Sequence, residues 1–226
     1  MMSLSFSSFF WMSAVYFYLK YSMSLPEYMS AFFLILVILL MYTINVGIMQ
    51  TKCGSANGSV FQATLLPWLF MFGPMIIALQ FFPEWKKPFS NTLGFIVARM
   101  AGGTQTLLDL LKPGSEVKLH YVYNDPSLLL NQFTTSNFDT VLQSFSEDMA
   151  YTEETKQALF NVVRLKDIVS EWIWYLLAAS VVISTSYTMM MNVQCTKTVD
   201  DYVLSHQVAM ADTTESEPLP LYTVTE

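Results

Sequence analysis

Three long windows of the chain contain no charged residue, and each is long enough to cross a membrane. The windows are residues 28–51, 53–83 and 172–196. A bilayer core of about 30 Å needs roughly 20 helical residues, whereas a surface helix of a soluble protein keeps a polar face along its length. The pattern therefore predicts three transmembrane helices, over about 28–49, 60–82 and 171–194.

Features inside these spans indicate that the helices pack against one another. Pro67 and Pro74 lie within the second span. Proline removes a backbone hydrogen bond and bends a helix, and in lipid such a break persists where neighbouring helices satisfy the freed groups. Four uncharged polar residues are interpreted as hydrogen-bonding groups between helices: Asn45, Gln62, Thr64 and Gln80.

The N-terminal segment, residues 1–27, has two interpretations. Residues 1–19 carry no charge but contain five serines among many aromatic residues. They form either a fourth span or an aromatic segment that lies in the membrane interface, and the serines slightly favour the interface. A secretory signal would begin with positive charge, which is missing here.

The chain outside the spans divides into an extramembrane module, residues 84–170, and an acidic tail, residues 195–226. Alternating polar and apolar residues predict a strand over 115–123. Short helices are predicted at 127–133 and 137–148, and a longer helix that starts at Thr152 and continues into the third span. The expected fold is mainly α: three transmembrane helices, with a fourth as an alternative, and a small, mostly helical module. Domain boundaries follow at 1–27, 28–83, 84–170, 171–194 and 195–226.

The distribution of lysine and arginine predicts the orientation. Cations near the span ends gather on the side of the module, and only Lys52 and Lys197 lie near span ends on the other side. The positive-inside rule therefore places the module in the cytoplasm. The cations on the module side are Lys20, Lys86, Lys87, Arg164 and Lys166.

Composition and the absence of known motifs argue against several classes of function. A net charge of −7 without a basic patch argues against nucleic-acid binding. No phosphate-binding loop, dinucleotide loop or hydrolase motif is present, so we expect no catalytic residues, no cofactor and no enzyme activity. The cysteines and histidines are too widely spaced for a structural metal site. Cys53 and Cys195 both fall just beyond helix ends on the side opposite the module, where they form either a disulfide or two free thiols.

Three blocks of sequence resemble one known family. The blocks are 51–54, 66–94 and 171–187, and the likeness is strongest at 81–94. Together they resemble membrane proteins of the nucleocytoplasmic large DNA viruses, the giant viruses. This chain has Glu84 where that family usually has a glycine, so the turn before Trp85 is expected to differ. The family-like residues are Pro83, Trp85, Pro88, Phe89, Ser90, Asn91, Trp172, Trp174, Tyr175 and Tyr187.

The resemblance implies a structural virion protein that catalyses nothing. Such a protein would sit in the internal virion membrane, which derives from the host endoplasmic reticulum, as a minor capsid or anchor protein. Residues 84–170 would contact the major and other minor capsid proteins, and copies of the chain could self-associate. A channel or transporter subunit is an alternative, as is a viral membrane assembly or fusion factor. The uncharged spans favour the anchor, since transport usually needs ionisable groups at depth.

Overall fold

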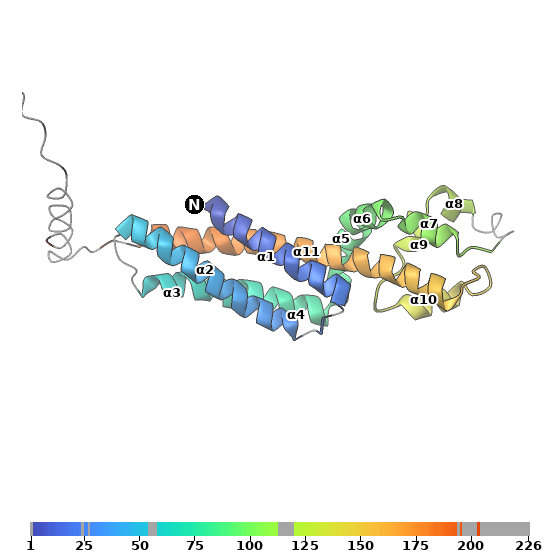
Figure 1. Ribbon diagram of the computed structural model, residues 1–226, viewed down its shortest axis with the longest axis horizontal. Coiled ribbons are helices and arrows are strands. Elements are labelled where there is room, and N and C mark those ends of the chain that lie inside the picture. The colour runs from blue at the N-terminus through green and yellow to red at the C-terminus, as the bar shows by residue number, and fades with distance from the viewer. Residues whose placement is uncertain are drawn as a thin grey trace, which may run out of the picture.

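The computed structural model describes residues 2–23, 25–26, 28–53, 58–112, 120–193, 195 and 203. Four long helical segments lie side by side as a bundle, and a smaller helical module caps one end of it (Figure 1). The predicted mainly α fold is confirmed; within the described residues, β structure is limited to an isolated bridge between Leu111 and Met149. The turn residues 54–57, the first part of the predicted strand and nearly all of the acidic tail lie outside the described residues.

Three of the bundle's segments are long and apolar enough to span a membrane. They are α2 (Met29–Cys53), the segment Ser59–Phe81, and α11 (Glu153–Met191). The outer surface of the bundle exposes many large apolar side chains, among them Phe32, Ile35 and Phe70. A soluble monomer rarely exposes so much apolar surface, so this surface is suited to contact with hydrocarbon.

The second span contains the predicted break. It begins as α3 (Ser59–Pro67), passes through a π-helical turn η1 (Trp68–Phe72), and ends as α4 (Gly73–Phe81). Pro67 and Pro74 bracket the π-helical turn, which widens the helix where regular hydrogen bonding is interrupted. Trp68 and Phe72 lie in this turn, and both are fully buried in the core of the bundle.

The first helix, α1 (Met2–Met23), is part of the bundle. It runs antiparallel to α11: Lys20 pairs with Glu171, and Ser13 accepts a hydrogen bond from the Trp172 indole. The side chain of Phe9 is fully buried against other rings of the core. These contacts make α1 part of the bundle. Among the described residues, length and hydropathy qualify the other three segments as candidate spans and not α1, so the fourth span and the interfacial segment both stay predictions.

Helix α11 connects the bundle to the module without a break. The Thr152 side chain caps its first turn and exchanges hydrogen bonds with Thr155, which confirms the predicted start. The helix continues for 39 residues to Met191. Its first half closes the core of the module, where Leu159 and Val163 pack with Phe133. Bundle and module therefore share one stiff element.

Short helices build the rest of the module. The predicted helices at 127–133 and 137–148 are confirmed in shorter form, but residues 120–123 are helical, so the strand predicted there is wrong. The elements are η2 (Pro83–Lys86), α5 (Lys87–Phe89), η3 (Ser90–Gly94), α6 (Phe95–Met100), α7 (Gly103–Leu108), α8 (His120–Asn124), α9 (Ser127–Leu130) and α10 (Phe138–Ser144).

Two glycines allow these short elements to lie directly on α11. A Cβ atom on Gly94 would come within 2.5 Å of the Lys166 carbonyl oxygen, and one on Gly103 within 2.5 Å of the Val162 side chain. Gly102, with a φ of 84°, makes the left-handed turn between α6 and α7. Backbone contact at Gly94 brings η3 close to the polar residues of α11.

Candidate functional site: the junction between bundle and module

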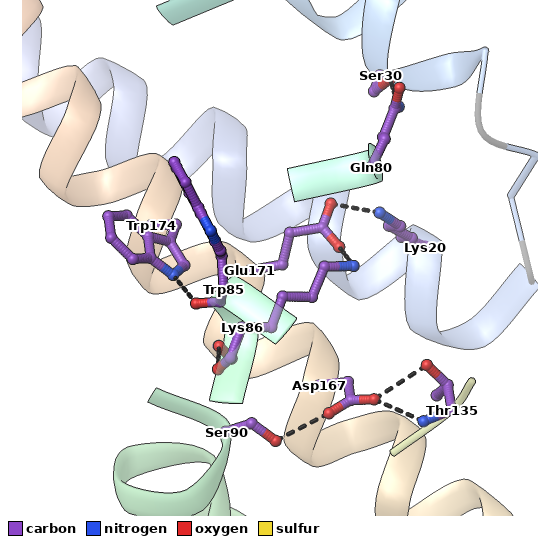
Figure 2. Close-up of polar contacts among 11 residues, drawn as sticks. Lys20, Ser30, Gln80, Trp85, Lys86, Ser90, Thr135, Asp167, Glu171 and Trp174 are labelled. Atoms are coloured by element: carbon purple, nitrogen blue, oxygen red, sulfur yellow. Dashed lines mark hydrogen bonds and ion pairs between the residues drawn. The ribbon is translucent and has the colours of Figure 1, made fainter. Parts of the chain in front are cut away.

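Glu171 is the first polar centre at the junction. Its carboxylate pairs with Lys20 of α1 at 2.5 Å and with Lys86 of η2 at 3.1 Å (Figure 2). Glu171 is buried, and both lysines are mostly covered. Burying a carboxylate alone costs several kcal/mol, and here two cations from separate elements offset that cost. One side chain of α11 thereby ties together the N-terminal helix and the segment that leaves the second span.

Asp167, one turn earlier on α11, is the second polar centre. One carboxylate oxygen accepts a hydrogen bond from the Ser90 hydroxyl at 2.8 Å. The other accepts from the backbone N–H and the hydroxyl of Thr135, at 2.8 and 2.9 Å (Figure 2). All three donors are neutral, and together they occupy both carboxylate oxygens. Asp167 thus joins η3 and the loop before α10 to α11.

Lys166 extends this network into the module. Its ammonium donates to the Asn91 side chain at 3.2 Å and to the Leu130 carbonyl at 3.0 Å. The pKa of Lys166 is lowered to about 8, chiefly by burial; the charge of Asp167 opposes this lowering, and that of Lys87 adds to it. The side chain is completely covered. Keeping the buried ammonium of Lys166 charged therefore costs folding free energy.

The family-like residues of two distant blocks meet at the junction. The Trp174 indole N–H donates to the Trp85 carbonyl at 2.8 Å (Figure 2). The Trp174 ring also packs edge-on against Phe89. Ser90 and Asn91 bond the side chains of Asp167 and Lys166, respectively. The structure therefore gives this string of residues a joining role between α11 and the exit from the second span.

The remaining family-like residues lie elsewhere. Tyr175 is buried in the bundle core, and Tyr187 lines a small cavity near the opposite end. Pro83 and Pro88 are exposed, and they start the short helices η2 and α5. Glu84, at the position where the resemblance departs, forms an ion pair with Lys87 on the same turn. Trp172 contacts α1 through Ser13.

A disulfide between Cys53 and Cys195 closes the opposite end of the bundle. Their Cα atoms are 5.2 Å apart. Lys52 lies beside it and donates to the carbonyl oxygens of Met190, Met191 and Val193, at the C-terminal end of α11. A cation at that position complements the helix dipole. The sequence left the disulfide and two free thiols as alternatives, and the structure has the disulfide.

The expected hydrogen bonds between spans are present for three of the four predicted residues. Asn45 donates to Thr64 at 2.8 Å and to Ser186 at 3.1 Å, so three spans meet at one polar point. Gln80 donates to the Ser30 hydroxyl at 2.9 Å. Gln62 is exposed on the outer face of α3, so that part of the prediction is wrong.

A pocket lies at the junction. It has a volume of about 580 Å³. Its charged lining residues come from α1, η2 and α11, and they include both carboxylates described above. These residues are Lys20, Lys86, Arg164, Asp167 and Glu171. The sequence placed several of them near span ends but gave no sign that they converge.

Comparisons of the chain with protein-family models, with curated proteins and with solved structures find no match. The fold and the junction therefore carry the functional argument, together with the resemblance seen in the sequence.

Proposed function

We propose that this chain is a structural anchor, embedded in a membrane, that holds its module at a fixed position above one face of the bilayer. The proposal is carried by the contacts at the junction, where two buried carboxylates of α11 hold several separate elements together. Glu171 and Asp167 of α11 bind elements from α1, η2, η3 and the loop before α10. A module bonded to the bundle at this many points moves together with it. Such rigidity suits a protein that holds its module at a fixed place relative to the membrane.

The orientation follows from two independent arguments. Cations flanking the spans gather at the module end, which favours the cytoplasmic side for the module. The disulfide lies at the other end, and disulfides persist on the lumenal or extracellular side of cellular membranes. Both arguments direct the module towards the cytoplasm.

The viral part of the proposal rests on the resemblance. We infer a minor capsid or anchor protein of a large DNA virus, placed in the internal virion membrane, whose module binds capsid proteins. The membrane would derive from the endoplasmic reticulum, so its cytoplasmic face would turn towards the capsid. The exposed surface of the module would then be the binding surface, and the apolar surface of the bundle would contact lipid.

Site-specific photo-cross-linking in infected cells tests this proposal. A photoreactive residue in place of Tyr121, which is 75% exposed on α8, should form adducts with capsid proteins. The matched control is the same replacement at Phe70, which is 73% exposed on the bundle and should yield lipid adducts. Adducts of Phe70 with capsid proteins and none from Tyr121 would refute the assignment of the binding surface.

Copy number and protease access test the location. Mass spectrometry of purified particles should find many copies per virion, and removal of the capsid should expose residues 84–170 to protease at the outer face of the internal membrane. Scarcity in particles would favour the assembly or fusion factor instead. Ion flux through liposomes containing the purified chain would favour the channel.

A further inference from the structure

We propose that the junction pocket binds the phosphate of an anionic phospholipid. This inference rests on insertion of the bundle in a membrane, and it is independent of the viral part of the proposed function. The volume of about 580 Å³ falls within the range of small-molecule sites. Lysine and arginine in a pocket between transmembrane helices on the cytoplasmic side suit a lipid headgroup.

The pocket lies at the depth of the headgroups. Glu171 is the last charged residue of α11 before the uncharged stretch that starts at Trp172. Phe82 and Trp85, a stacked and exposed aromatic pair, lie beside the pocket residue Pro83 at the exit from the second span. Tryptophan gathers at the boundary between hydrocarbon and water. A ligand in this pocket would therefore lie next to the lipid surface.

The lining combines apolar side chains with polar and charged ones. Leu25, Leu79 and Ile168 line the pocket from the bundle, and Phe160 lines it from the module beside Thr135 and Ser136. A phospholipid carries both kinds of group, since its acyl chains adjoin a charged phosphate. The pocket thus matches a lipid better than a small, uniformly polar ion.

The charges of the lining leave one positive charge uncompensated. Three cations line the pocket, and Glu171 is shared by two of them, Lys20 and Lys86. Asp167 is bound by neutral donors. Three cations against two carboxylates give a surplus of one, which a single phosphodiester would neutralise.

Arg164 is the lining residue that we expect to bind the phosphate. One guanidinium nitrogen donates to the Lys20 carbonyl at 2.7 Å, and the group lies 5.9 Å from the centre of the Tyr21 ring. Among the described residues, no carboxylate forms an ion pair with Arg164. Arginine has five donors and binds phosphate through a planar fork. A fixed guanidinium with donors to spare is therefore available at the pocket.

Lipid titration of the full-length, detergent-solubilised chain tests the proposal. Phosphatidylglycerol, a phosphodiester with one negative charge, should raise the midpoint of thermal unfolding and remain bound in native mass spectra, whereas phosphatidylcholine should do so weakly. Arg164→Gln should weaken the apparent affinity by about tenfold or more, since it removes a charge-assisted hydrogen bond. The control Arg99→Gln removes the same charge from an exposed site outside the pocket and should bind as the wild type does.

A second pair of variants covers the case in which Arg164→Gln does not fold. Ser136→Glu adds a negative charge at an exposed lining position and should abolish binding, while Thr140→Glu adds the same charge on the exposed face of α10 and should not. Equal losses from both members of either pair would overturn the proposal, because they would indicate diffuse charge attraction. Equal stabilisation by inorganic phosphate would overturn the lipid as the source of the phosphate.

Discussion

Replacing Gly94 by alanine tests the close contact on which the junction depends. Gly94 ends η3, and its backbone lies against the backbone of α11 at Lys166. An alanine Cβ would come within 2.5 Å of the Lys166 carbonyl oxygen and 3.1 Å of the Lys166 Cγ. The first of these neighbours is a backbone atom inside a long helix, so it cannot move aside as a flexible side chain would.

The loss of stability expected for Gly94→Ala follows from the distance by which η3 and α11 must separate. Ordinary contact starts at 3.4 Å, so η3 and α11 must separate by about 0.9 Å from the 2.5 Å position. A shift of that size stretches the bonds from Ser90 to Asp167, now 2.8 Å, and from Lys166 to Asn91, now 3.2 Å, towards or beyond hydrogen-bonding range. Overpacking costs about 1–3 kcal/mol. At roughly 2–4 °C per kcal/mol for a chain of this size, the midpoint of thermal unfolding should fall by roughly 2–12 °C.

Thermal unfolding of the full-length chain in detergent, followed by circular dichroism, measures this shift. The matched control is Gly47→Ala in α2, where an added Cβ meets nothing within 4 Å. Alanine is the better helix former by about 1 kcal/mol, so Gly47→Ala should leave the midpoint unchanged or raise it. A Gly94→Ala variant as stable as the wild type, or an equal loss of stability in both variants, would show that the close contact at Lys166 does not limit the size of residue 94.

Three further predictions concern single features. Cys53→Ser removes a disulfide that closes a sequence separation of 142 residues, so stability should fall by up to about 5 kcal/mol, measured as a lower midpoint that reductant no longer changes. Lys166 has a pKa lowered to about 8, so its cationic form destabilises the fold and stability should rise as pH increases from about 8 towards 10.5. Lys166→Met should remove that rise in pH-dependent unfolding curves. Thr152→Ala removes the cap of α11 and should cost about 1 kcal/mol, seen as faster hydrogen exchange in the first turn.

The long helices were predictable because their signals are strong and local. The uncharged windows were sufficient for the spans. The absence of glycine and proline from Ser127 to Glu217, together with the start at Thr152, was sufficient for α11. The predicted strand failed at His120–Tyr123, where a short alternating pattern fits a helical turn as well as a strand. In α1, the serines suggested an interface, yet Ser5 and Ser13 are buried, because a small side chain also permits close helix contact.

The junction was beyond the reach of sequence patterns because its contacts are distant along the chain. Lys20 and Glu171 are 151 residues apart, and Ser90 and Asp167 are 77 apart. Charge counting found the lysines near span ends but treated Glu171 only as the limit of an uncharged window. The π-helical turns, η1 and η3, had no distinct signal beyond the nearby prolines. Only the three-dimensional arrangement shows that one acid serves two lysines.

The continuity of α11 makes the molecule a lever. The part of the helix before Glu171 is roughly 27 Å long at 1.5 Å per residue, and it has no hinge between the bundle and the module. If the bundle tilts by about 10° in the bilayer, the start of α11 at Glu153 sweeps sideways by roughly 5 Å. Local curvature or thickness of the membrane would therefore be converted into lateral displacement of the outer surface of the module.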